Sequence, residues 1–352
     1  MSRPARHVPG AACVLLALLA PGAPARAQTP APITPDVVLS GEGGDPDAGS
    51  PVRVVRPLGE TVGASLFGPL RPKDWRPLGV DTFFSEGWDE PYAPAPGDAP
   101  RQTWINNADG AFYRLYVFSF SFARNVPGGD NGYNGSYFLF TPFSRRFELG
   151  WFVPFVVSAP DALKAPSGAN WTGFGDLTIA PRFLLAEDRR YTVTANLFVR
   201  TPTGDPRNGN GVASLSPDVE FWANPVDRWV VRGGVGVTVP TNRTDASSRL
   251  WAANPWSGFN ASPGPFTSLD VRLAVGRYLT PADARYFSNF VPYLAANLHT
   301  ELSGGNNTYF SLTPGFRFGL GNDWYALGGL EVPVVGPLPF ATQTIVQLIK
   351  NF

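Results

Sequence analysis

The chain has 352 residues with equal numbers of basic and acidic side chains, so it lacks the basic excess typical of nucleic-acid-binding proteins. Charged residues make up 16% of the chain, below the roughly one quarter usual in soluble domains, while aromatic residues reach 13%. A single cysteine excludes a disulfide framework. This composition, with 38 glycines and 37 prolines, favours either a large β-protein or one whose outer surface faces lipid.

The first element in chain order is a targeting segment at residues 1–27. Arg3 and Arg6 precede the short apolar run AACVLLALLAPG, and Ala25 and Ala27 form an Ala-x-Ala site. The run is too short to cross a bilayer as a helix, and the pattern is that of a cleaved secretory signal peptide rather than of a buried N-terminal helix. We expect cleavage before Gln28, export in a Gram-negative-type bacterium, and a mature chain with 25 basic and 28 acidic residues.

A Pro/Gly/Trp-rich N-terminal extension follows at residues 28–110. Residues 28–100 contain thirteen prolines, too many for continuous helix or sheet, so the extension is predicted to be largely irregular. Its middle part, SLFGPLRPKDWRPLGVDTFFSEGWDEPY, concentrates Phe and Trp and is a candidate docking segment. We expect the extension either to lie in the periplasm or to act as a plug.

Alternating extended segments occupy residues 111–352. In YTVTANLFVR (191–200), for example, Tyr191, Val193 and Leu197 share one face, and polar residues share the other. Such alternation predicts strands with one apolar and one polar face. Twelve strands are predicted, at 111–124, 135–143, 146–158, 173–186, 190–202, 212–224, 228–241, 266–279, 289–301, 307–320, 323–335 and 339–352.

The connections between these strands alternate between tight turns, such as AEDRR and GND, and longer loops, such as PTGDPRNGNG. An even strand number with short turns at one end and long loops at the other is typical of an outer-membrane barrel, whereas a β-sandwich gives no reason for such segregation. The predicted fold is therefore all-β, a transmembrane antiparallel β-barrel of about twelve strands.

Aromatic residues near strand ends and loops support the membrane interpretation. Such residues form girdles at both interfaces of outer-membrane barrels, although they also pack soluble cores. The set comprises Trp151, Trp171, Trp222, Trp229, Trp251, Trp256, Trp324, Tyr278, Tyr286 and Tyr325. Phe352 ends the last alternating strand and resembles the C-terminal signal read by the outer-membrane assembly machinery, with Lys350 as a departure from its usual pattern. The last strand is expected to pair with the first, because lipid tolerates no open sheet edge.

Two short motifs carry a resemblance to a known family. GFGDLTIAPRFLL contains Gly173, Gly175, Asp176 and Leu177, and the loop PTGDPRNGNG begins with Pro202, Thr203 and Gly204. Together they resemble a family of outer-membrane barrels associated with the meta-cleavage pathway of phenol degradation, over residues 111–352. The resemblance implies a transport function; the proline-rich extension and the long loop at 241–265 lie outside it.

The period-two pattern turns a set of mostly charged residues toward the barrel lumen. They are Glu148, Asp176, Arg182, Arg200, Asp218, Glu220, Arg232, Asp270, Arg272, Asn297, His299, Glu301, Arg317 and Glu331. Charges of both signs could line a polar path, but most are expected to pair structurally across the narrow interior of a small barrel.

Enzymatic alternatives depend on His299, the only histidine of the expected mature chain, with Asn297 and Glu301 on the same face. These neighbours could orient the imidazole of a lipid-modifying hydrolase, but their face points into the lumen, away from membrane lipid. No nucleotide signature or metal-ligand cluster is evident, and no cofactor is expected.

The sequence therefore predicts a non-enzymatic outer-membrane channel or transporter for small, apolar or aromatic molecules. The alternatives are a structural barrel that transports nothing and, less favoured, the hydrolase. The expected partners are outer-membrane lipid, the assembly machinery and a small-molecule solute, without nucleic acid.

Overall fold

The computed structural model describes residues 57–70, 75–97, 99–125, 131–160, 170–204, 213–242, 266–303, 308–336 and 340–352. The predicted signal peptide at 1–27 and residues 28–56 of the extension lie outside the described residues. No helix among those described is long and apolar enough to cross a membrane.

The described part of the chain contains one helix and a series of strands. The helix is α1 (Leu58–Phe67). The strands are β1 (Leu115–Arg124), β2 (Gly132–Pro142), β3 (Phe147–Pro160), β4 (Asn170–Phe174), β5 (Thr178–Glu187), β6 (Tyr191–Arg200), β7 (Ser214–Val226), β8 (Trp229–Pro240), β9 (Ser268–Arg277), β10 (Ser288–Glu301), β11 (Thr308–Gly321), β12 (Trp324–Val335) and β13 (Thr342–Asn351).

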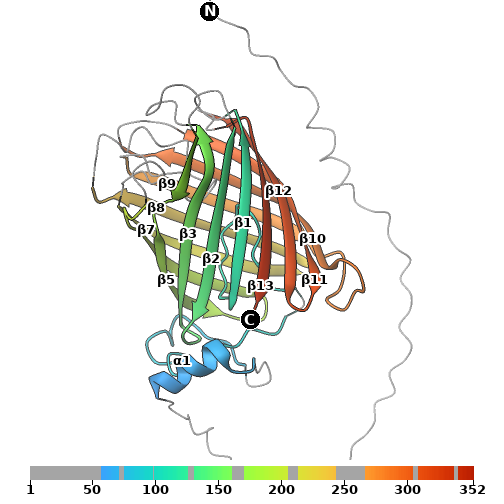
Figure 1. Cartoon of the computed structure of the whole chain (residues 1–352). Coiled ribbons are helices and arrows are strands. Elements are labelled where there is room, and N and C mark those ends of the chain that lie inside the picture. The colour runs from blue at the N-terminus through green and yellow to red at the C-terminus, as the bar shows by residue number, and fades with distance from the viewer. Residues whose placement is uncertain are drawn as a thin grey trace, which may run out of the picture. The chain divides into compact units, whose positions relative to one another are not determined.

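The strands form a closed barrel (Figure 1). Neighbours in sequence pair antiparallel from β5 to β13, β13 pairs with β1, and β1, β2, β3 and β5 complete the ring. The short β4 pairs only with β3, at residues 155–160. Among the described residues, twelve antiparallel strands therefore close the barrel, which confirms the predicted fold class.

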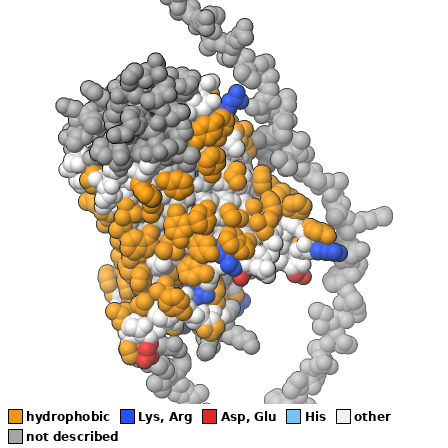
Figure 2. Space-filling view, viewed as in Figure 1, with side chains coloured by type: hydrophobic (Ala, Val, Ile, Leu, Met, Phe, Trp, Pro, Cys, Tyr) orange, Lys and Arg blue, Asp and Glu red, His pale blue; other side chains and the backbone are white. Residues whose placement is uncertain are grey.

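The two faces of the barrel wall differ in polarity as the alternation predicts. On β7, for example, Leu215, Val219 and Phe221 are exposed outward, whereas Asp218 and Glu220 are buried inside. Hydrophobic side chains cover the outer face seen in Figure 2. The wall thus presents an apolar surface outward and a largely polar one inward, as burial in lipid requires.

The tight turns after β2, β5, β7 and β11 lie at one end of the barrel, here called the tight-turn end, and the other end is called the loop end. Helix α1 lies at the tight-turn end (Figure 1). The Ser65 hydroxyl donates a hydrogen bond to the Phe143 carbonyl at 3.1 Å, and Arg114 Nη1 donates to the Ser65 carbonyl at 3.2 Å. One helix therefore interrupts an extension that was predicted to be irregular, and it is fastened to the barrel rim.

Two predicted strands have different limits in the structure. The first begins at Leu115 rather than at residue 111, because Ala111, Phe112 and Tyr113 lie buried inside the barrel. The predicted strand 173–186 is divided into β4 and β5 at residues 175–177. There Asp176 leaves the ladder, since its carboxylate accepts hydrogen bonds from Arg200 Nη2 and from the Gly204 amide, both at 3.0 Å.

The assignment of Trp222 and Tyr278 to an outer aromatic girdle is wrong. Their exposed fractions are 1% and 3%, and both side chains belong to the interior. Trp222 lies beneath the Arg101 guanidinium, which is 4.9 Å from the centre of its ring, and the Tyr278 hydroxyl donates to the Pro100 carbonyl at 3.1 Å. The partners of both rings come from the N-terminal extension. The assignment of Tyr325 is wrong as well, because its ring packs inside, 4.1 Å from the Arg317 guanidinium. The side chains of Trp171, Trp251 and Trp256 lie outside the described residues.

Candidate functional site

The candidate site is the barrel lumen, which contains a segment of the N-terminal extension. Residues 99–114, here called the plug, run through the interior and continue directly into β1. Trp104, Ile105 and Ala108 of the plug are fully buried. The Trp104 ring stacks on Tyr293 of β10, with ring centres 4.8 Å apart. The lumen is therefore filled in part by the chain's own backbone.

Three inward-facing arginines hold carbonyl groups of the plug. Arg317 donates to the Thr103 carbonyl at 3.2 Å, Arg232 donates to that of Asp109 at 3.0 Å, and Arg182 donates to that of Ala111 at 3.0 Å. Irregular backbone at membrane depth is stable only when its polar groups find partners inside the protein. Here, lumenal arginines provide the hydrogen-bond donors for three of the plug's carbonyl groups.

Carboxylates and a phenol hold amide groups of the same segment. The Gly110 amide donates to Glu220 at 3.1 Å, the Tyr113 amide donates to Glu148 at 2.6 Å, and the Ile105 amide donates to the Tyr293 hydroxyl at 2.8 Å. The side chain of Asn106 reaches Glu331 at 2.8 Å and Thr313 at 3.0 Å. Strands on several sides of the barrel thus bind one short peptide.

Gly110 lets the plug approach β7 closely. Its φ of 59° lies in the left-handed region, and a Cβ atom at this position would lie 2.2 Å from the carbonyl carbon of Phe221. A larger residue would require both a strained backbone and a shift of the strand.

All lumen-lining residues predicted from the sequence are buried in the structure. They are Glu148, Asp176, Arg182, Arg200, Asp218, Glu220, Arg232, Asp270, Arg272, Asn297, His299, Glu301, Arg317 and Glu331. Several form one chain of ion pairs across β3, β5, β7 and β9. In it, Arg182 pairs with Glu148 and, at 3.6 Å, with Glu220, while Arg272 pairs with Asp218 and, at 3.3 Å, with Glu220.

The remaining predicted residues lie apart from this chain. Arg200 pairs with Asp176 at 3.0 Å, and Arg232, Arg317, Asn297 and Glu331 contact the plug. Most of these lumenal charged groups therefore bind other groups of the protein.

His299 lies beside Asp270, with 2.7 Å between His299 Nδ1 and Asp270 Oδ1, and its ring stacks on Tyr309. The hydroxyls of Ser268 and Ser311, on the adjacent strands, are buried without a hydrogen-bond partner. The structure thus places an acid beside the imidazole but gives neither serine a bond to it. The described residues also contain no group of three His, Cys, Asp or Glu side chains suited to hold a metal ion.

An apolar wall in the lumen, next to the chain of ion pairs, was missed by the sequence reasoning. Its inward-facing side chains come from β1, β2, β3, β6 and β13, and they are Val117, Phe138, Phe140, Phe152, Phe198 and Ile345. The stretch YFLF (137–140) is apolar on both faces. This loss of alternation is the signal by which an apolar lumen wall could have been found.

A cavity of about 100 Å³ lies between this wall and the plug. Trp104, Asn106, Asn107 and Asp109 line it on the plug side, and Arg182 and Glu220 also border it. On the wall side, Ser119, Ser136 and Gln347 accompany the six apolar residues. Free space in the lumen is thus found beside the apolar wall.

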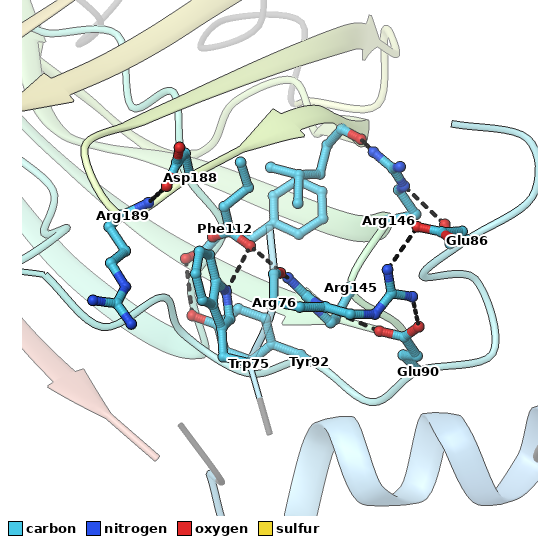
Figure 3. Close-up of polar contacts among 12 residues, drawn as sticks. Trp75, Arg76, Glu86, Glu90, Tyr92, Phe112, Arg145, Arg146, Asp188 and Arg189 are labelled. Carbon is cyan, nitrogen blue, oxygen red and sulfur yellow. Dashed lines mark hydrogen bonds and ion pairs between the residues drawn. The ribbon is translucent and has the colours of Figure 1, made fainter. Parts of the chain in front are cut away.

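Charged residues at the tight-turn end fasten the extension before it enters the lumen (Figure 3). Arg145, in the turn between β2 and β3, pairs with Glu90 at 3.2 Å and with Glu187 at 3.1 Å. Arg76 pairs with Glu86 and Glu90, each at 2.6 Å. The hydrogen bond to Glu86 raises the pKa of the Arg76 guanidinium above its ordinary value.

Other contacts at this end involve the plug entrance. Arg101 pairs with Glu187, and burial lowers the pKa of Arg101 while that carboxylate opposes the change. Arg146 donates to the carbonyls of Leu184 and Gly79 at 2.9 and 3.0 Å. The extension is therefore clamped to the rim by Arg101, Arg145 and Arg146.

Comparisons with known proteins cover parts of the chain. A family model described as "Putative MetA-pathway of phenol degradation" matches residues 143–233, less than half of the chain, and confirms the resemblance stated from the sequence motifs within that range. No curated protein matches the sequence significantly.

Solved structures similar to the barrel include an outer-membrane channel from Pseudomonas putida F1, with 12% identity, a TM-score of 0.48, and coverage of 74% of this chain and 100% of that one. The KdgM porin has 8% identity, a TM-score of 0.42, and coverage of 68% and 99%. The NanC porin has 6% identity, a TM-score of 0.46, and coverage of 67% and 99%.

Proposed function

We propose that the chain is a non-enzymatic outer-membrane channel for small apolar or aromatic molecules, exported through a cleaved signal peptide. The outward apolar surface of the closed barrel supports insertion in lipid, with outer-membrane lipid and the assembly machinery as partners. The solute passes between the plug and the apolar wall.

The observation that carries this proposal is the position of the cavity. It is bordered by Phe138, Phe140, Phe152 and Phe198, and the charged side chains of Arg182 and Glu220 that also border it are paired within the protein. An apolar solute leaves water for this wall without needing to displace an ion pair, while a hydrated ion gains little there. The family description, which names phenol degradation, is consistent with an aromatic solute.

A structural barrel remains the second candidate, because the plug is hydrogen-bonded on several sides of the lumen. The two candidates differ in solute flux. The initial rate of uptake of radiolabelled toluene should be higher in Gram-negative cells that produce the protein than in cells that lack it.

Two adjacent substitutions test the route. Val117→Trp places a large ring in the cavity, whereas Phe118→Trp changes a side chain that is 49% exposed on the outer face of the same strand. We expect uptake to fall to the background rate for Val117→Trp and to be retained for Phe118→Trp, at equal protein levels in the outer membrane. Uptake at the background rate for the unmodified chain would support the structural barrel instead.

A further inference from the structure

The apolar wall changes polarity along the barrel axis. In the register of β1 and β2, Val117 faces Phe138 near the tight-turn end, Ser119 faces Ser136 one step further, and Ser121 faces Asn134 beyond them. On β13, Gln347 pairs with Ser119, and Gln343 lies two steps closer to the loop end. On β1 and β2 the wall therefore changes from apolar to uncharged polar side chains toward the loop end, while on β13 Ile345 lies between the two glutamines.

Several of these polar groups are buried without a hydrogen-bond partner. They include Ser121 Oγ, Asn134 Oδ1 and Gln343 Oε1. Asn107, on the plug, lines the cavity, and both its amide nitrogen and its amide oxygen lack a partner. Buried polar atoms in native proteins are nearly always paired, so the unpaired Asn107 amide at the cavity indicates a place where a bound molecule completes the bonding.

The charge around the cavity limits what that molecule can be. Asp109 and Glu220 border the space, so an anionic solute meets two carboxylates. The bordering guanidinium of Arg182 is already paired with Glu148 and Glu220. The unpaired Asn107 amide can both donate to and accept from an uncharged group, which suits a hydroxyl or a carbonyl.

We propose that the cavity binds a small neutral molecule with an aromatic or apolar body and one uncharged polar group. The body lies against the phenylalanines of the wall, and Asn107 hydrogen-bonds the polar group. The polar side chains from Ser119 to Gln343 form the approach from the loop end. This inference rests on the proposed channel function and adds to it the class of solute and the residue that recognises its polar group.

Three probes of similar size test the class of solute: benzyl alcohol, toluene and benzoate. Binding to the purified full-length mature chain in lipid nanodiscs is measured by equilibrium dialysis at pH 7.5, with empty nanodiscs as the background. We expect saturable binding of benzyl alcohol, at least tenfold tighter than that of benzoate. Equal affinity for benzoate would overturn the restriction to neutral molecules.

Two variants test Asn107. Asn107→Leu should weaken benzyl alcohol binding about tenfold while toluene binding changes less than threefold, because only the alcohol loses a hydrogen bond. Asn107→Ser, which introduces a hydroxyl able to donate and accept a hydrogen bond, should lose less than Asn107→Leu. A merely structural role for Asn107 would weaken both probes equally, and this result would overturn the assignment.

Binding and uptake together distinguish this inference from the channel proposal. If the chain binds benzyl alcohol with this selectivity but does not accelerate toluene uptake, the binding site is supported and the channel function is refuted. If the chain accelerates uptake but binds benzyl alcohol and benzoate equally, the channel function is supported and the binding site is refuted.

Discussion

Replacing Arg182 by Met should destabilise the barrel strongly, because it removes the counter-charge of a buried carboxylate. Glu148 is fully buried and pairs with Arg182, while Glu220 keeps Arg272 at 3.3 Å. The change therefore leaves one carboxylate without a cationic partner. Breaking a buried pair in this way costs about 3–5 kcal/mol, and we expect a loss of that size in the free energy of unfolding, measured by urea titration of the protein folded in lipid vesicles.

The double variant Arg182→Met/Glu148→Gln is the matched control. Glutamine carries no charge and retains an acceptor for the Tyr113 amide, which donates to Glu148 at 2.6 Å. The Ala111 carbonyl still loses its donor, at a cost of about 1–3 kcal/mol. We expect the double variant to be clearly more stable than the single one. Equal stability of the two, or a single variant within about 1 kcal/mol of the unmodified chain, would refute the argument from charge.

Three further predictions concern the outer face, the last residue and the histidine. Leu197→Arg, on the lipid side of β6, should cost about 2–4 kcal/mol of folding stability, whereas Tyr191→Arg at the strand end should cost about 0–1 kcal/mol; equal losses in urea titrations would contradict the membrane depth assigned to them. Deleting Phe352 removes its ring from Tyr116 and the proposed assembly signal, so less protein should reach the outer-membrane fraction, although the purified variant should refold in detergent; normal insertion would contradict the signal. His299→Ala should leave toluene uptake within about twofold, and the pure protein should show no His299-dependent phospholipase or lipid A deacylase activity; a hydrolysis abolished by this substitution would overturn the channel proposal.

The alternating pattern was sufficient to find the barrel wall and its charged interior. Asp218, Glu220 and Arg272 could be assigned to the lumen because the opposite face of each strand is apolar. Phe138 and Phe140 could not be assigned to the lumen in this way, since the neighbouring Tyr137 and Leu139 are also large and apolar. Alternation identifies a face only where the two environments differ, and beside the cavity the lumen is as apolar as the outer surface.

The plug could not be placed from the sequence for another reason. Its segment forms no regular ladder, and its carbonyls and amides bind side chains more than 30 residues away, such as Glu148 and Arg317. Every residue type has these backbone groups, except that proline lacks the amide N–H, so no composition or spacing reveals their partners. The stretch AFYRLYVFSF continues the alternation of β1 backward, which explains why Ala111 was assigned to a strand.

The direct junction between the plug and β1 has a consequence for the order of assembly. Tyr113 is bound inside the barrel two residues before Leu115 begins β1, and β1 pairs with β13 to form the seam. When the first and last strands join, the end of the plug is therefore already held next to the seam. While the sheet curls, Glu148, Glu220 and Arg317 can each find their backbone partner on a single peptide. The plug then occupies the interior of the closing sheet and limits how tightly the sheet can curve.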